Sequence, residues 1–330
     1  MLPVPDAVSA IDNVLKSQAN RTLFWIRGHK THLVLPGVLL FSIGVLFESM
    51  MDAVAKLAST SYPLPQILLF RCVFGLFPLL LLVAILNSYS VSTLFYKSRL
   101  QVLRAALFGL VFCLYVYSLK YLAMVTAIAL FLTLPFFMLM VSSAFHNEKV
   151  TIKNMFSTLG GFIGVILIMQ PDFSDYGLVM LMPIVAAILT AFSLSISKSL
   201  SGELDPVSIN INSTIILFFA SLPLALFAWE PVQTGDWITL LLVGIFGGVA
   251  ILAYTAAVGI SKMSVLAPFQ YFSVVWAALF GWVIWADAPS MVAVCGIALI
   301  VISGMAMTLL QRDYVCSSGD KACPFILFDV

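Results

Sequence analysis

Long apolar runs constrain the fold of this chain more than any other feature of its sequence. A helix needs about 20 mostly apolar residues to cross the hydrocarbon core of a bilayer. The segments that meet this requirement are 33–58, 64–86, 100–119, 122–145, 153–170, 176–198, 207–229, 236–259, 263–285 and 289–310. Short turns containing Gly, Pro, Asp or Ser separate many of them. We therefore predict an all-α polytopic membrane protein with ten transmembrane helices.

The composition supports lipid as the main solvent of this chain. Hydrophobic residues make up 62% of it and charged residues 9%, whereas a soluble globular chain is about 25% charged. A net charge of +1 gives no broad basic surface for a nucleic acid, so we expect no such partner. The three histidines and five cysteines are scattered. We therefore expect no metal site and no cofactor.

Basic residues predict the orientation, because they are enriched in cytoplasmic loops. If the N-terminus is cytoplasmic, the cytoplasmic segments carry Lys16, Arg21, Arg27, Lys30, Lys97, Arg99, Arg104, Lys149, Lys153, Lys198, Lys262, Arg312 and Lys321. The other side carries only Lys56 and Lys120. We predict that residues 1–32 and 311–330 are both cytoplasmic segments.

The chain also contains a weak internal repeat. An offset of 139 residues carries Tyr115 onto Tyr254 and lays predicted helices three to five on helices eight to ten. A unit of five helices is odd, so the second copy would enter the membrane inverted. Inverted repeats are typical of secondary carriers with a site near the bilayer midplane. We predict repeats at 33–170 and 176–310 that work by alternating access.

Several short segments resemble a known family. These are FRCVFGLFPLLLL in the second helix, the acidic residues Glu148 in FHNEK and Asp287 in WADAP, and the glycine-rich GGFIGVILI. With the five-plus-five layout, they make residues from about 33 to 310 similar to the EamA branch of the drug/metabolite transporter superfamily. The resemblance implies a secondary carrier with a central cavity between its halves. Members include amino-acid and metabolite exporters and S-adenosylmethionine importers.

Ionisable residues inside the predicted spans need a reason, because charge is costly there. Glu48, Asp52 and Lys56 share one face of the first helix, and Arg71 lies at a depth similar to that of Glu48 on the second helix. Three interpretations stay open. Glu48 and Arg71 form a structural ion pair, or the group binds solute or relays a proton, or charges near a helix end, Lys56 above all, are solvated.

Aromatic and amide side chains add to this candidate site. A cavity for a partly apolar solute needs aromatic walls and a few fixed polar groups. Tyr115 and Tyr254 stand at equivalent positions of the repeat, well inside their spans, although aromatic residues in membrane helices often face lipid. The predicted solute-binding residues are Glu48, Asp52, Arg71, Tyr115, Tyr254, Gln270 and Tyr271.

Proline, glycine and asparagine residues in the spans predict packing rather than binding. Pro135 and Pro268 each predict a kink, because proline interrupts the main-chain hydrogen bonds. Gly244 and Gly248 have the small-xxx-small spacing that lets helices approach closely. Asn210 opens the seventh helix, where we expect structural hydrogen bonds.

The predicted function is secondary transport of a small amphipathic or zwitterionic metabolite that is amino-acid-like, nucleoside-like or S-adenosylmethionine-like. The driving force is the solute gradient, exchange or protons, and the transporter is a monomer or homodimer. The spans hold no histidine–metal cluster or facing aspartate pair and no phosphate-binding loop, so we do not expect an enzyme. A membrane-embedded enzyme or a channel is the alternative. Short loops predict a bacterial inner membrane.

Single-cysteine labelling tests the predicted topology. In a cysteine-free background, cysteines introduced near Tyr89 and after Arg312 should react only from the cytoplasmic side. Cysteines near Asp172 and Asp236 should react from the opposite side, because the basic residues place these loops outside. Two of these four sites on the wrong side would overturn the ten-helix prediction.

Overall fold

The computed structural model describes residues 34–86, 98–122, 124–169 and 177–276, with a few isolated positions beyond. Within this part all regular structure is helical. The α-helices are α2 (Val34–Ser61), α3 (Leu64–Leu86), α5 (Arg99–Tyr121), α6 (Met124–Phe131), α7 (Leu134–His146), α8 (Ile152–Met169), α9 (Leu181–Leu200), α10 (Pro206–Phe227), α11 (Trp237–Ile260) and α12 (Met263–Leu266). The 3₁₀ helices are η1 (Gly177–Met180), η2 (Thr234–Asp236) and η3 (Ala267–Tyr271). The terminal segments 1–32 and 311–330 lie outside the described residues, as does most of the predicted span 289–310.

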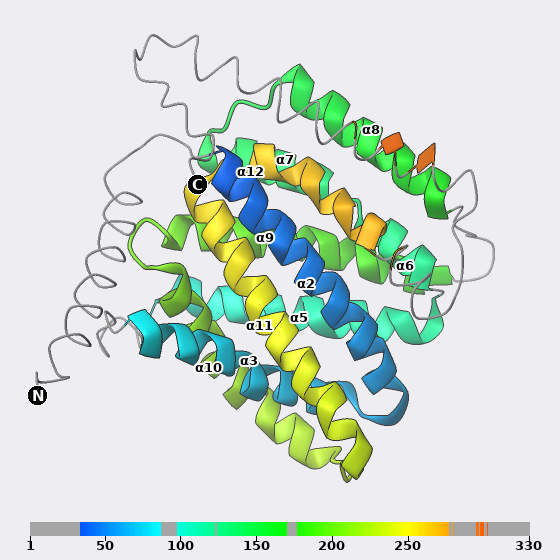
Figure 1. Ribbon diagram of the computed structural model, residues 1–330, viewed down its shortest axis with the longest axis vertical. Coiled ribbons are helices and arrows are strands. Elements are labelled where there is room, and N and C mark those ends of the chain that lie inside the picture. Colours follow the sequence, from blue (N-terminus) through cyan, green and yellow to red (C-terminus); the bar gives the residue numbers. More distant parts are fainter. Residues whose placement is uncertain are drawn as a thin grey trace, which may run out of the picture.

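Six helices in the described part are long and apolar enough to cross a membrane. They cover Leu35–Ser59, Leu64–Ile85, Arg99–Ser118, Leu178–Leu200, Pro206–Phe227 and Thr234–Ile260. Each coincides with a predicted span, because a long apolar run is a strong helix signal in a membrane protein. The described chain is thus a bundle of apolar helices, as predicted (Figure 1).

Two predicted spans are interrupted in the structure. The prediction of one helix over 122–145 is wrong, since α6 ends at Phe131 and α7 begins at Leu134, directly before Pro135. The segment from 263 likewise begins with the short α12 and continues as η3, which contains Pro268. Proline removes a main-chain donor and clashes with the preceding turn. Two turn residues therefore separate α6 from α7 just before Pro135, whereas at Pro268 the chain tightens to a 3₁₀ helix and stays helical to Trp276.

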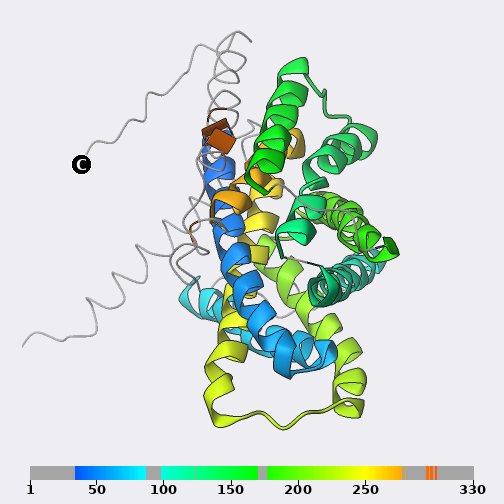
Figure 2. The ribbon, with the colours of Figure 1, turned by 90° about the vertical axis from the view of Figure 1, so that its right-hand side faces the viewer.

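Helices α2 and α11 form an antiparallel pair that runs through the centre of the bundle. They lie side by side in Figures 1 and 2. A Cβ atom added to Gly37, near the start of α2, would lie 1.8 Å from the Ser261 hydroxyl oxygen, just beyond the end of α11. A Cβ atom on Gly247 would lie 3.1 Å from the Met51 sulfur, further along α2. This pair joins the first half of the chain to the second.

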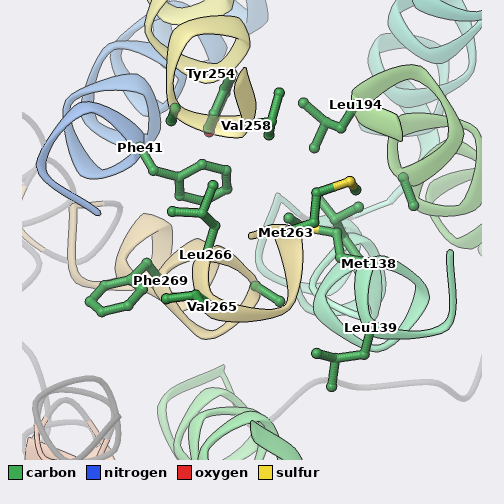
Figure 3. Packing of buried hydrophobic residues seen from close by; sticks show 14 of the residues in the cluster. Phe41, Met138, Leu139, Leu194, Tyr254, Val258, Met263, Val265, Leu266 and Phe269 are labelled. Carbon is green, nitrogen blue, oxygen red and sulfur yellow. The ribbon is translucent and has the colours of Figure 1, made fainter. Parts of the chain in front are cut away.

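The largest buried apolar cluster also spans both halves. Its members come from α2, α7, α9, α11, α12 and η3, as Figure 3 shows. The Phe41 and Tyr254 rings meet edge to face with their centroids 4.9 Å apart. Met138, Leu194 and Met263 fill the space beside them. Such packing stabilises the bundle through close van der Waals contact, since lipid tails are as apolar as these side chains.

Glycines bring α3 and α11 into backbone contact. A Cβ atom on Gly244 would lie 2.3 Å from the Phe74 Cβ atom, and one on Gly248 would lie 2.4 Å from the Gly75 carbonyl oxygen. Real Cβ atoms do not approach other atoms so closely. The packing role predicted for Gly244 and Gly248 is therefore confirmed.

Replacing Gly248 with alanine should destabilise the bundle. The added methyl group meets backbone of Gly75, which cannot move aside, and overpacking typically costs about 1–3 kcal/mol. We expect a lower melting temperature in detergent. The control is Gly235→Ala, because nothing lies within 4 Å of a Cβ atom there. Equal melting temperatures for the two variants would contradict the close approach of α3 and α11.

Candidate functional site

A polar cluster lies inside the bundle where α2, α11 and η3 meet. The Tyr254 hydroxyl donates a hydrogen bond to the Glu48 carboxylate. The Gln270 side-chain nitrogen donates to the same carboxylate oxygen at 3.3 Å. Tyr254 and Gln270 are buried, whereas Glu48 keeps partial exposure. The structure thus brings together three predicted site residues. Glu48 is more than 200 residues away in sequence from both Tyr254 and Gln270.

Arg71 approaches this cluster from α3 but does not form the ion pair that the sequence left open. Its guanidinium carbon lies 4.4 Å from the centre of the Phe108 ring and 5.2 Å from that of Phe112, where cation–π attraction stabilises it. Its Nε donates to the Met51 sulfur at 3.1 Å. Among the described residues no carboxylate oxygen lies within 4 Å of it. Glu48 still acts on its charge from a longer distance.

Asp52 and Tyr115 lie close enough to the cluster to interact with it electrostatically. Asp52 lies one helical turn beyond Glu48 and is half-buried. It interacts electrostatically with Glu48, Arg71 and Tyr115. The Tyr115 ring is buried and packs against Phe131 with centroids 5.0 Å apart. Six of the seven predicted site residues therefore share one neighbourhood.

Tyr271 lies apart from the others. It belongs to a separate apolar cluster with Ile128 and Val165, and its ring covers Gly161 on α8. Its buried hydroxyl has no hydrogen-bond partner among the described residues. Successive residues of the tight η3 turn point in different directions, so Gln270 faces Glu48 while Tyr271 packs toward α8.

Arg104 is a central residue whose role the sequence did not reveal. It was counted with the cytoplasmic charges, yet its side chain is only 1% exposed. Its guanidinium donates to the side-chain oxygens of Ser197 at 2.6 Å, Ser213 at 2.6 Å, Asn210 at 2.7 Å and Thr255 at 3.0 Å, and to the Ile209 carbonyl at 3.5 Å. The one available signal was its position inside the predicted span 100–119. Arg104 ties α5 to α9, α10 and α11, and the structural hydrogen bonds expected of Asn210 are confirmed.

A small cavity of about 20 Å³ lies between the two buried arginines. Arg71 and Arg104 line it together with Phe108, Ser213 and Thr214. A cavity needs roughly 10–15 Å³ to hold a water molecule. This one therefore accepts a single small polar group and not a whole metabolite.

Glu148 joins several segments at the end of the bundle that the basic residues assign to the cytoplasm. Its carboxylate lies 2.7 Å from the Lys198 ammonium group. It also accepts hydrogen bonds from the main-chain amides of Met263 at 3.2 Å and Ser264 at 2.9 Å. Lys198 in turn donates to the Ser261 carbonyl at 2.7 Å. Burial acts to raise the pKa of Glu148, but the Lys198 charge and these hydrogen bonds outweigh it and hold the pKa below 4.5.

The opposite end of the bundle is joined by neutral hydrogen bonds and one carboxylate. Tyr62, after α2, donates to Asp236 at 2.6 Å and accepts from the Gln233 amide at 3.1 Å. Gln66 on α3 pairs with the main chain of Glu230 through bonds of 2.7 and 2.9 Å. The turn between α2 and α3 is thereby held against the segment between α10 and α11 (Figure 2).

Comparison with known proteins identifies the family. The EamA-like transporter family matches residues 35–170 and 177–309, most of the chain. The chain belongs to the EamA-like transporter family. This membership confirms the resemblance drawn from the sequence and, with the apolar helices, makes the chain a multi-pass membrane protein.

Relatives of this EamA-like transporter carry different names. The riboflavin transporter of Brucella anthropi is 30% identical over 220 residues, 65% of this chain and 77% of that protein. The pseudopaline exporter CntI of Pseudomonas aeruginosa is 23% identical over 285 residues, covering 85% and 98%. The S-adenosylmethionine uptake transporter of Rickettsia prowazekii is 24% identical over 292 residues, covering 88% and 98%. A protein of known crystal structure has the same fold, with a TM-score of 0.73 at 18% identity over 84% of this chain and 99% of that one.

The contacts of Glu148 predict a pH-dependent stability. Because the folded pKa is lowered from 4.5, the carboxylate stabilises the fold above about pH 4.5, and this contribution is lost as the pH falls through the folded pKa. Glu148→Gln should lower the melting temperature at pH 7. On acidification, the melting temperature of this variant should fall by less than that of the wild type.

Scanning fluorimetry from pH 7 to pH 3 measures this difference. Glu230→Gln is the control, since Glu230 is exposed and its hydrogen bonds to Gln66 use the main chain, and its melting curve should follow the wild type. If Glu148→Gln follows the wild type at every pH, the contacts of Glu148 do not stabilise the fold.

Proposed function

We propose that this chain is a secondary transporter that moves a small amphipathic or zwitterionic metabolite by alternating access. The observation that carries the proposal is the polar cluster inside the bundle, where Glu48 is held by Tyr254 and Gln270 and has no cationic partner within 4 Å among the described residues. An ionisable residue inside a membrane bundle is costly and is usually functional. A carboxylate held by neutral groups keeps its charge available to a solute.

The proposal includes ten transmembrane helices in two inverted five-helix repeats, 33–170 and 176–310. Helix bounds support it, since the offset that aligns Tyr115 with Tyr254 also carries the start of α6 onto the start of α12. The family match falls in two parts of similar extent. In this arrangement the halves rock against each other about a site between them, and the α2–α11 pair is one of the surfaces that join them.

The chemistry of the cluster suits an amphipathic solute with charges of both signs. Glu48 and Asp52 attract an ammonium group, Arg71 attracts a carboxylate, and Tyr115 and Tyr254 supply aromatic walls. Relatives named for riboflavin, pseudopaline and S-adenosylmethionine support a metabolite of this size class. Gln270 orients Glu48, whereas Tyr271, which we also predicted as a binding residue, packs toward α8.

Transport without chemical change separates the proposal from its alternative, a membrane enzyme. All of the relatives above are named as transporters or exporters, which supports transport, and bacterial relatives support the bacterial inner membrane. Glu48 and Asp52 are the groups through which protons would couple. Coupling is tested by imposing a pH gradient during uptake, and oligomeric state by the mass of the purified complex.

Uptake into proteoliposomes tests the proposed site. Labelled S-adenosylmethionine, riboflavin and an amino-acid mixture are offered in turn, and mass spectrometry shows whether the accumulated solute is unaltered. Glu48→Gln and Tyr254→Phe should reduce uptake by about tenfold or more, since a hydrogen bond to a charged group contributes about 1.5–3 kcal/mol. Both variants should keep a melting temperature near that of the wild type.

The control is Tyr117→Phe, because Tyr117 is exposed and its hydroxyl bonds, in the described part of the chain, to Tyr121 on the same helix. Its uptake should match the wild type. Wild-type rates in Glu48→Gln and Tyr254→Phe would refute the site, and a chemically altered product would favour the enzyme.

A further inference from the structure

The cavity between α3, α5, α10 and α11 is electropositive. Two guanidinium groups, those of Arg71 and Arg104, line it, and no acidic residue is among its described lining residues. In the part of the chain that the structure describes, neither guanidinium has a carboxylate within 4 Å. Two buried cations without a close counter-ion raise the local potential and favour an anion between them.

The two arginines differ in what they can still bind. All five N–H groups of a guanidinium are donors, and those of Arg104 are directed to neutral acceptors on α9, α10 and α11. Arg71 uses only Nε, and its acceptor is the Met51 sulfur, a weak one. The terminal nitrogens of Arg71 have no acceptor among the described residues. Arg104 therefore contributes potential, whereas Arg71 has donors to offer.

Size restricts what can enter. At about 20 Å³ the cavity admits one small group, and the terminal nitrogens of a guanidinium match the two oxygens of a carboxylate. The hydroxyl groups of Ser213 and Thr214 also line the cavity. Arg71 in turn interacts with Glu48 and Asp52, so an anion beside Arg71 and a cation beside the carboxylates would be held in the same region.

We infer that this cavity is an anion subsite of the transport site, which takes the carboxylate of the solute on the terminal nitrogens of Arg71. The inference rests on the proposed transport function and narrows it. The recognised solutes carry an amino-carboxylate group, with the ammonium end toward Glu48 and Asp52. A solute that lacks the carboxylate leaves Arg71 unpaired and is transported poorly.

Formate is the probe for the subsite alone. Purified protein in lipid nanodiscs is melted while formate replaces gluconate at constant ionic strength, because gluconate is too large for the cavity. Formate should raise the melting temperature of the wild type in a concentration-dependent way. It should do so equally in Arg99→Gln, the control, which removes an exposed arginine from the same helix as Arg104.

Two variants should abolish the formate effect by different routes. Arg71→Gln removes the donors. Gly247→Ala keeps them but places a methyl group 2.8 Å from Nε and 3.2 Å from a terminal nitrogen of Arg71. A formate shift that is unchanged in either folded variant overturns the subsite, as does the absence of a shift in the wild type.

Competition for uptake by the wild-type protein supplies a test that needs no variant. Unlabelled S-adenosylmethionine and its decarboxylated analogue compete with the labelled solute in proteoliposomes. The carboxylate form should compete at least about tenfold better, the loss expected when a charge-assisted bond of about 1.5–3 kcal/mol is missing. Equal competition, or transport of riboflavin alone, overturns the subsite while leaving transport intact. A formate shift without uptake of any solute instead refutes the transport function and leaves an anion site.

Discussion

Compensation of buried charge in an apolar bundle is the constraint on which the rest of this structure depends. An ionised side chain in the membrane core costs at least about 2.5–3.5 kcal/mol on insertion scales. Arg104 meets that cost with five hydrogen bonds to neutral groups. Because its partners lie on three other helices, the position of α5 against α9, α10 and α11 is fixed by one guanidinium. Apolar packing alone would specify this arrangement much less strongly, because an apolar side chain can contact lipid tails about as favourably as it contacts another helix.

The same constraint separates structural charges from those available to a solute. Arg104 is saturated, so it has nothing left to bind. Glu48 retains partial exposure beside its two neutral donors, and within the described residues the hydrogen bond of Arg71 goes to a sulfur atom. Charged groups whose hydrogen-bonding capacity is not fully used inside a bundle gain the most interaction energy when a solute of opposite charge binds. That difference in hydrogen bonding, more than depth or residue type, is why we propose the Glu48 cluster as the site.

The sequence predicted the positions of the helices well and the contacts between them less well. The bounds of α3 coincide with the predicted span 64–86, and those of α5, α10 and α11 differ from prediction by a few residues, because hydrophobic length is a local property. The predicted span 122–145 failed at Pro135, since the sequence does not say whether neighbouring helices will accommodate a broken ladder.

Contacts between distant segments depend on helix rotation, which hydropathy does not fix. The sequence predicted Glu48 and Arg71 at one depth, and the structure gives an electrostatic interaction between them without a close ion pair. It did not reveal that the acceptors of Arg104 would come from α9 to α11, or that Tyr254 would reach Glu48. Gln270 and Tyr271 are adjacent in sequence and yet face different helices. A basic residue near a span end is read as a sidedness signal, and this hid the burial of Arg104.

The two ends of the bundle decide what alternating access would require. At the predicted cytoplasmic end, Glu148 links the α7 terminus to Lys198 and to the start of α12. At the other end, Tyr62 and Gln66 hold the segment before α11. Each set contains a few hydrogen bonds, which contribute about 0.5–1.5 kcal/mol each when neutral and 1.5–3 when charged.

By these figures the charged contacts at the Glu148 end cost more to break than the mainly neutral contacts at the Tyr62 end, and the two costs together set the equilibrium between opening at one end and at the other. A ligand shifts such an equilibrium by the difference in its affinity for the two states. In the proposed mechanism a solute at Glu48 on α2 and Tyr254 on α11 would contact the helix pair that joins the halves, and its binding would act on both ends at once. The charged contacts lie at the Glu148 end and the mainly neutral ones at the Tyr62 end. Ionic strength and acid should consequently bias opening toward the Glu148 end, whereas the Tyr62 end responds mainly to the loss of individual hydrogen bonds.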